Sequence, residues 1–83
     1  MRNLDLYTIS SLDEVGDEKN FIMVIEEPDG WVEVLQGTRK EIFVKLLDIF
    51  HIEEDEWDTK LDILMHVEDL NGDGYPLVKI YTV

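Results

Sequence analysis

The segment from residue 21 to residue 35 constrains the fold most, because it predicts two strands joined by a tight turn. Phe21–Ile25 is a continuous apolar run, rich in β-branched residues and too short for a typical helix. It therefore predicts a central strand that is covered on both faces or nearly so. Glu27–Gly30 places Pro and Gly where a type I turn favours them. Trp31–Leu35 alternates and completes a hairpin, with Trp31 expected in the core.

A helix is predicted to begin at Thr38, because Gly37 interrupts the strand and the residues from Thr38 to Glu41 match a capping box. Apolar residues then recur at three- and four-residue spacing as far as Phe50, so one stripe of the helix faces the core. The helix should end near Ile52. The acidic run that follows would be unfavourable at the negative end of the helix dipole, and the cation His51 would be favourable there.

Alternating patterns predict three further strands, over Leu4–Ile9, Leu61–Glu68 and Val78–Val83. The polar stretch Ser10–Asn20 predicts a loop or a short helical turn. The chain has 83 residues, which is enough for one hydrophobic core and one domain spanning residues 1–83. We therefore predict an α+β domain of order β-β-β-α-β-β. Its antiparallel β-sheet of four to five strands should carry one α-helix packed across one face.

Charge is the strongest functional signal in the composition. The chain has 20 Asp and Glu against 7 Lys and Arg, a net charge of -13, whereas a magnitude of about 2 to 8 maintains the solubility of a small domain. Such a molecule repels nucleic acid and anionic membranes and attracts basic surfaces. The predicted helix has three basic residues and two acidic ones, so the acidity belongs to the rest of the chain. We expect the sheet face opposite the helix and the loop ends to carry it; an evenly charged rim is the alternative.

The composition also limits the environment. The chain has no cysteine, which excludes disulfides and thiolate metal sites. No apolar run is long enough for a signal sequence or a membrane span, so we expect a soluble protein in a cytoplasm. Hydrophobic residues make up 45% of the chain, which favours independent folding.

Catalytic patterns are missing from the sequence. His51 and His66 form no metal-binding spacing, and there is no phosphate-binding glycine loop and no nucleophile elbow. Basic residues are too few and too scattered to form a nuclease groove. We predict that the protein is not an enzyme and uses no cofactor.

One motif resembles a metal site. The residues from Asp69 to Gly74 reproduce the first half of the calcium loop of EF-hand and dockerin proteins, with side-chain oxygens at Asp69, Asn71 and Asp73. Ile80 stands where that loop needs a bidentate Glu. Asn-Gly and Asp-Gly are also strong hairpin-turn signals, so we predict a turn and no metal, with those three residues as a weak candidate set.

Two acidic segments are the candidate partner-binding residues. The first comprises Asp13, Glu14, Asp17 and Glu18, and the second comprises Glu53, Glu54, Asp55, Glu56, Trp57 and Asp58. Carboxylates can stand in for phosphates, and the ring of Trp57 can take the place of a base or contact an arginine. The alternative is that Trp57 folds back and seals the edge of the core.

In size, acidity and lack of cysteine the chain resembles phage-encoded proteins that imitate nucleic acid: anti-CRISPR proteins, restriction inhibitors and uracil-DNA glycosylase inhibitors. The resemblance implies an inhibitor that binds the positively charged groove of a basic nucleic-acid-binding protein in a host cytoplasm, without binding nucleic acid itself. Two alternatives are an immunity or antitoxin-like protein that blocks a nuclease toxin, and a small calcium-binding or adaptor module.

Overall fold

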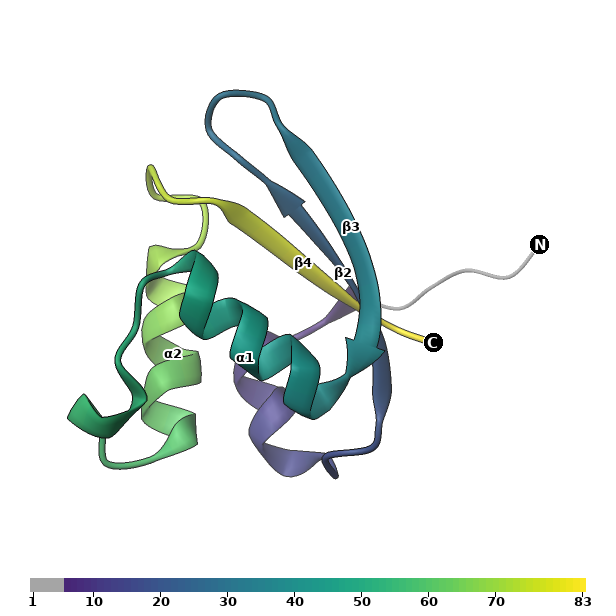
Figure 1. Ribbon diagram of the computed structural model, residues 1–83, viewed down its shortest axis with the longest axis vertical. Coiled ribbons are helices and arrows are strands. Elements are labelled where there is room, and N and C mark those ends of the chain that lie inside the picture. Colours follow the sequence, from purple (N-terminus) through teal and green to yellow (C-terminus); the bar gives the residue numbers. More distant parts are fainter. Residues whose placement is uncertain (1–5) are drawn as a thin grey trace.

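A computed structural model describes residues 6–83 of the chain. Four strands form one antiparallel sheet in the order β1-β4-β2-β3, and the helices pack on one of its faces (Figure 1). The strands are β1 (Leu6–Tyr7), β2 (Asn20–Glu26), β3 (Val32–Thr38) and β4 (Leu77–Thr82). The helices are the 3-10 helix η1 (Ile9–Glu14), α1 (Arg39–Ile49), the 3-10 helix η2 (Glu54–Glu56) and α2 (Lys60–Leu70). The α+β class and the antiparallel sheet are thereby confirmed.

The prediction of one helix, and with it the order β-β-β-α-β-β, is wrong. The segment read as a strand over Leu61–Glu68 belongs to α2, which has 11 residues, the same length as α1. Thr59 caps it, since the Thr59 hydroxyl accepts a hydrogen bond from the Asp62 amide at 3.1 Å. Ile63, Leu64 and Val67 are buried, a spacing that fits a helical stripe. In so short a segment the same apolar positions fit both the alternation of a strand and the three- and four-residue spacing of a helix. Packing against the sheet decides in favour of the helix.

The predicted hairpin and the start of α1 are confirmed. β2 pairs with β3 along its whole length, and Gly30 takes the positive φ of 95° in the turn between them. The capping box at Thr38 is complete. The helix ends at Ile49, earlier than expected, because His51 adopts a φ of 55° and the chain turns away.

The first strand ends earlier than predicted, at Tyr7. β1 has two residues, and Leu4 and Asp5 of the expected first strand lie outside the described residues. The following segment forms η1, the short helical turn that was one of the two expectations for Ser10–Asn20. β4 closely matches the predicted last strand.

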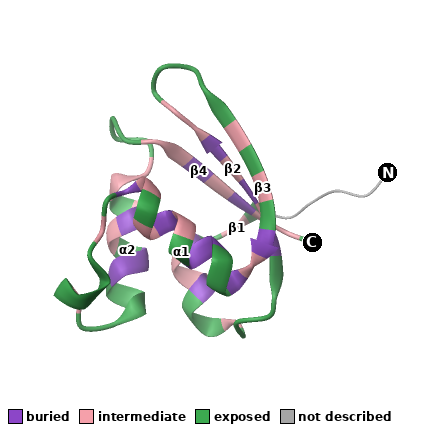
Figure 2. Ribbon diagram, in the orientation of Figure 1, coloured by how far each residue is buried: buried purple, intermediate pink, exposed green. Residues whose placement is uncertain are grey.

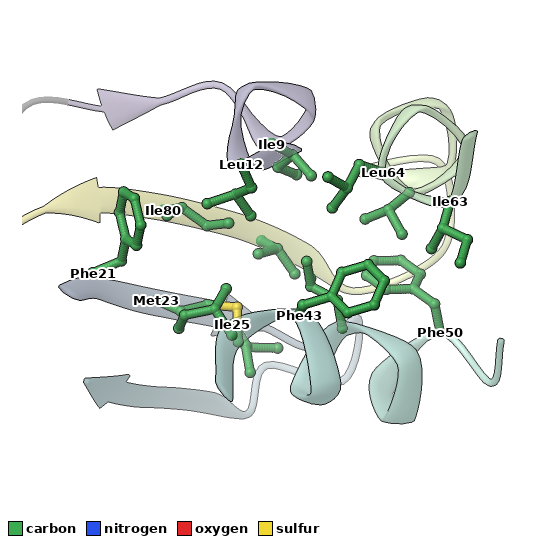
Figure 3. Packing of buried hydrophobic residues seen from close by; sticks show 14 residues of the cluster. Ile9, Leu12, Phe21, Met23, Ile25, Phe43, Phe50, Ile63, Leu64 and Ile80 are labelled. Atoms are coloured by element: carbon green, nitrogen blue, oxygen red, sulfur yellow. The ribbon is translucent and has the colours of Figure 1, made fainter. Parts of the chain in front are cut away.

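The core lies between the sheet and the helical layer (Figure 3). Phe21, Met23 and Ile25 alternate along β2 and point toward the helical layer, and they share one cluster with Leu12 of η1 and Leu64 of α2. Trp31 is 66% exposed, so its predicted place in the core is wrong. It directly follows the turn between β2 and β3.

The other face of the sheet, which we call the open face, is not covered by any described element. Its main outward positions are Leu6, Ile22, Val24, Glu26, Val32, Val34, Gln36, Leu77, Lys79 and Tyr81. Glu26 and Lys79 are the charged residues of this set, and their charges cancel. The expectation that this face and the loop ends carry the negative charge is therefore wrong for the face. β2 is central in the sheet but covered on one face only.

None of the helices in residues 6–83 combines the length and the apolar character that crossing a membrane requires.

The capping box leads to a prediction about pH. The Glu41 carboxylate accepts hydrogen bonds from the backbone amide (3.0 Å) and the hydroxyl (3.1 Å) of Thr38, and these lower the pKa of Glu41 from its ordinary value of 4.5. A lowered folded-state pKa means that this stabilisation is present above the unfolded-state pKa and is lost as the pH falls through the folded-state pKa. We expect Thr38→Val to raise the pKa of Glu41 in an NMR titration of the side-chain carboxyl carbon. An unchanged titration in that variant would contradict the capping role.

Candidate functional site

The second acidic segment, Glu53–Asp58, connects α1 to α2. Its middle forms η2, in which the Trp57 amide donates to the Glu54 carbonyl at 3.2 Å. All five carboxylates of the segment are exposed. The ion pairs found within residues 6–83 join Arg39 to Asp17 and Lys45 to Glu33, so none of these five carboxylates is neutralised by a cation of the described chain.

Trp57 is half-buried and packs against the core, and its ring centroid lies 4.8 Å from that of His66. It therefore seals an edge of the core, as one of the two expectations described, and part of its ring stays at the surface. An open depression on the surface is lined by Glu56, Trp57, Asp58, Asp62, Met65, His66 and Asp69. An aromatic ring thus lies in a shallow site with carboxylates around it.

The sequence did not predict the two carboxylates that α2 adds to this site: Asp62 was not a candidate, and Asp69 was assigned only to the calcium-like turn. Asp62 and Asp69 are exposed and lie two helical turns apart, with His66 between them. They reach the same depression only because the segment is a helix, and a strand would have dispersed them over two faces. The available signal was Thr59-Lys60-Leu61-Asp62, which matches the start of a helix and precedes an apolar run.

The stretch that contains this site has a large excess of negative charge. Between residues 53 and 73 there are nine carboxylates and one lysine. The ammonium of that lysine, Lys60, lies 5.5 Å from the ring centroid of Phe43, over the aromatic face. We call Trp57 and the carboxylates around it the acidic surface, defined by Glu53, Glu54, Asp55, Glu56, Asp58, Asp62 and Asp69.

The carboxylates of the first acidic segment have two different roles. Asp13, Glu14 and Glu18 are exposed, at the end of η1 and in the loop after it. Asp17 instead forms an ion pair with the buried guanidinium of Arg39, and its carbonyl accepts from the Lys40 amide at 3.4 Å. Asp17 therefore holds this loop to the first turn of α1, and its charge is already compensated within the fold.

The fold brings the two acidic segments to the same end of the molecule, away from the turn between β2 and β3 (Figure 1). η1 packs against α2, and η2 leads into the first turn of α2. Much of the chain at this end is exposed (Figure 2).

The turn that resembles a calcium loop connects α2 to β4, so it is not the hairpin turn between two strands that was expected. Asn71 ends α2, and its side chain bonds both backbone groups of Val78: Oδ1 accepts from the amide at 2.6 Å and Nδ2 donates to the carbonyl at 3.1 Å. Gly72 and Gly74 take positive φ angles of 82° and 86°. Asn71 thus has a structural role. Within residues 6–83, no three His, Cys, Asp or Glu side chains are grouped so that they could hold a metal ion.

The acidic surface therefore combines three properties: exposed carboxylates, a half-buried aromatic ring and a rigid helical support. These are properties of a surface that binds a cationic partner, because the carboxylates attract it and the ring offers a contact for a guanidinium group. No protein-family model, curated protein or solved structure that we compared matches the chain.

Proposed function

We propose that the protein is an acidic inhibitor that imitates nucleic acid, of the anti-CRISPR, anti-restriction or DNA-glycosylase-inhibitor type. It binds the positively charged groove of a DNA- or RNA-binding protein in the cytoplasm of a host cell, and it acts by occupancy, not by catalysis. The observation that carries this proposal is the ring of Trp57 in a depression surrounded by exposed carboxylates, among them Glu56, Asp58, Asp62 and Asp69.

Arginine recognition explains how carboxylates can replace phosphates. The planar guanidinium group forms paired hydrogen bonds with carboxylate and with phosphate in the same geometry. Asp62 and Asp69 are fixed at a defined spacing by α2, so they present two acceptors at constant positions. The exposed part of the Trp57 ring offers a stacking surface for an arginine or an aromatic side chain of the partner.

The distribution of charge supports the same proposal. The open face has balanced charge, whereas the stretch between residues 53 and 73 has nine carboxylates. The molecule has a net charge of -13, and this stretch contributes nine of its carboxylates against one lysine. Such an uneven distribution orients the molecule in the field of a basic groove before contact. Fast association that depends on ionic strength is the expected consequence.

Salt dependence is the first test. The immobilised protein would be used to capture basic proteins from a nuclease-treated host lysate, and the captured protein would be measured by surface plasmon resonance between about 50 and 500 mM NaCl. We expect the association rate to fall at least about tenfold over this range, and duplex nucleic acid to compete for the same site. Binding that is indifferent to salt and to competitor would refute the electrostatic mechanism.

Two matched double variants locate the site. Glu54→Lys with Asp55→Lys reverses two charges on the acidic surface. Glu27→Lys with Asp29→Lys makes the same change in net charge in the turn between β2 and β3, which lies at the opposite end of the molecule (Figure 1). The first pair should slow association strongly and affect dissociation little, since exposed charges act chiefly by steering. The second pair should have a much smaller effect. Equal effects would mean that only total charge matters and that the acidic surface is not the site.

A further inference from the structure

The open face is unusually apolar for a sheet surface that no described element covers. Leu6, Val34 and Val32 are 66%, 63% and 55% exposed, and Ile22 and Val24 are half-buried between them. The register makes these residues neighbours, because Ile22 pairs with Tyr81 and Gln36, and Val24 pairs with Val34. The apolar side chains therefore form one continuous patch across the sheet. Single exposed apolar residues are ordinary, whereas a continuous patch indicates an interface.

The charges on the open face indicate which partner can cover it. A copy with a net charge of -13 repels a second copy, and that repulsion is weak at the open face because the charges of this face cancel. Its two charged residues, Glu26 and Lys79, are diagonal neighbours, because Lys79 pairs with Val24 and Glu26 pairs with Leu77. A two-fold axis in the plane of the face, close to Val24 and Leu77, brings each Glu26 opposite Lys79 of the second copy. We propose that the open face is the interface of a homodimer in which two copies pack sheet against sheet.

The size of the face sets the expected affinity. The seven residues of β2, at about 3.3 Å each, and three long strands about 4.8 Å apart give a footprint of roughly 23 by 15 Å per copy. That is about 350 Å², within the range of the largest apolar patches on monomers and below the roughly 800 Å² per partner of a standard interface. The dimer should therefore be weak, with a dissociation constant on the order of 0.1 mM.

Sedimentation equilibrium of the full chain between roughly 1 and 500 μM tests the proposal. We expect a monomer–dimer equilibrium that shifts toward dimer as NaCl rises from about 50 to 500 mM, because salt screens the repulsion between two acidic copies. This is the opposite of the salt effect expected for the basic partner, so the dimer and the proposed inhibitor function can fail separately. A chain that stays monomeric at the highest concentration and at both salt levels overturns the dimer.

Two pairs of variants locate the interface. Val34→Glu on the open face should raise the dimer dissociation constant at least about tenfold, and Val44→Glu, at a position 56% exposed on α1, should leave it unchanged. Glu26→Lys and Lys79→Glu should each weaken the dimer, and the double variant should restore it. Equal effects of the two valine changes, or no restoration by the double variant, would overturn the proposed interface. Thermal melting checks that each variant is folded, and the charge exchange leaves the apolar residues of the face intact.

Discussion

Truncation of Leu12 to Ala is expected to lower the free energy of unfolding by about 3 to 4 kcal/mol. Leu12 is fully buried and comes from η1, a six-residue 3-10 helix that packs against α2 (Figure 3). So short a helix has little stability of its own and depends on the side chains that it buries. A domain of this size has about 4 to 12 kcal/mol of stability, so the variant would lose a large part of it.

Leu61→Ala is the matched control, since it removes the same atoms from a position on α2 that is 39% exposed. We expect it to lower stability by less than about 1 kcal/mol. Urea unfolding followed by circular dichroism measures both variants, and similar urea slopes would show that the same folded unit is being compared. A Leu12→Ala midpoint close to that of Leu61→Ala would mean that η1 is not part of the cooperative core.

Asn71→Ala is expected to lower the free energy of unfolding by about 2 to 3 kcal/mol, somewhat less than Leu12→Ala. The Asn71 side chain bonds the amide and the carbonyl of Val78, and Val78 is 2% exposed. Removing the side chain leaves two backbone groups at a buried position without these partners. The link also joins the end of α2 to the start of β4, so the loss should appear in global unfolding.

Asp73→Ala is the control for this change, because Asp73 is exposed in the same turn and makes no side-chain hydrogen bond within residues 6–83. It should be nearly neutral. Both variants would be melted with and without about 1 mM calcium, a level at which weak sites begin to bind. We expect calcium to change neither melting curve. A rise in the melting temperature of the unmodified protein that is lost in both variants would instead assign the turn to calcium.

Several elements follow from the amino-acid sequence by itself, because their signals are local. The turn before Trp31 needs a residue that tolerates a positive φ, and Gly30 provides it. The first helix begins at Thr38 because two side chains three residues apart bond each other's backbone. The Thr38 hydroxyl accepts from the Glu41 amide, and the Glu41 carboxylate accepts from the Thr38 amide. The exposure of the residues from Glu53 to Glu56 also follows, since a run of unpaired carboxylates is stable only in water. Each of these outcomes depends on residues that are close in the chain.

Other features were decided only by tertiary structure, because they depend on which side chains meet across the fold. The segment from Lys60 to Leu70 has a pattern that fits a strand or a helix, and packing of Ile63, Leu64 and Val67 against the core selects the helix. The same choice brings Asp62 and Asp69 beside Trp57 and so adds two carboxylates to the acidic surface. The sequence determined that the chain is acidic and contains both sheet and helix. The placement of the second helix on one face of the sheet determined where the acidity gathers, and that the opposite face is apolar.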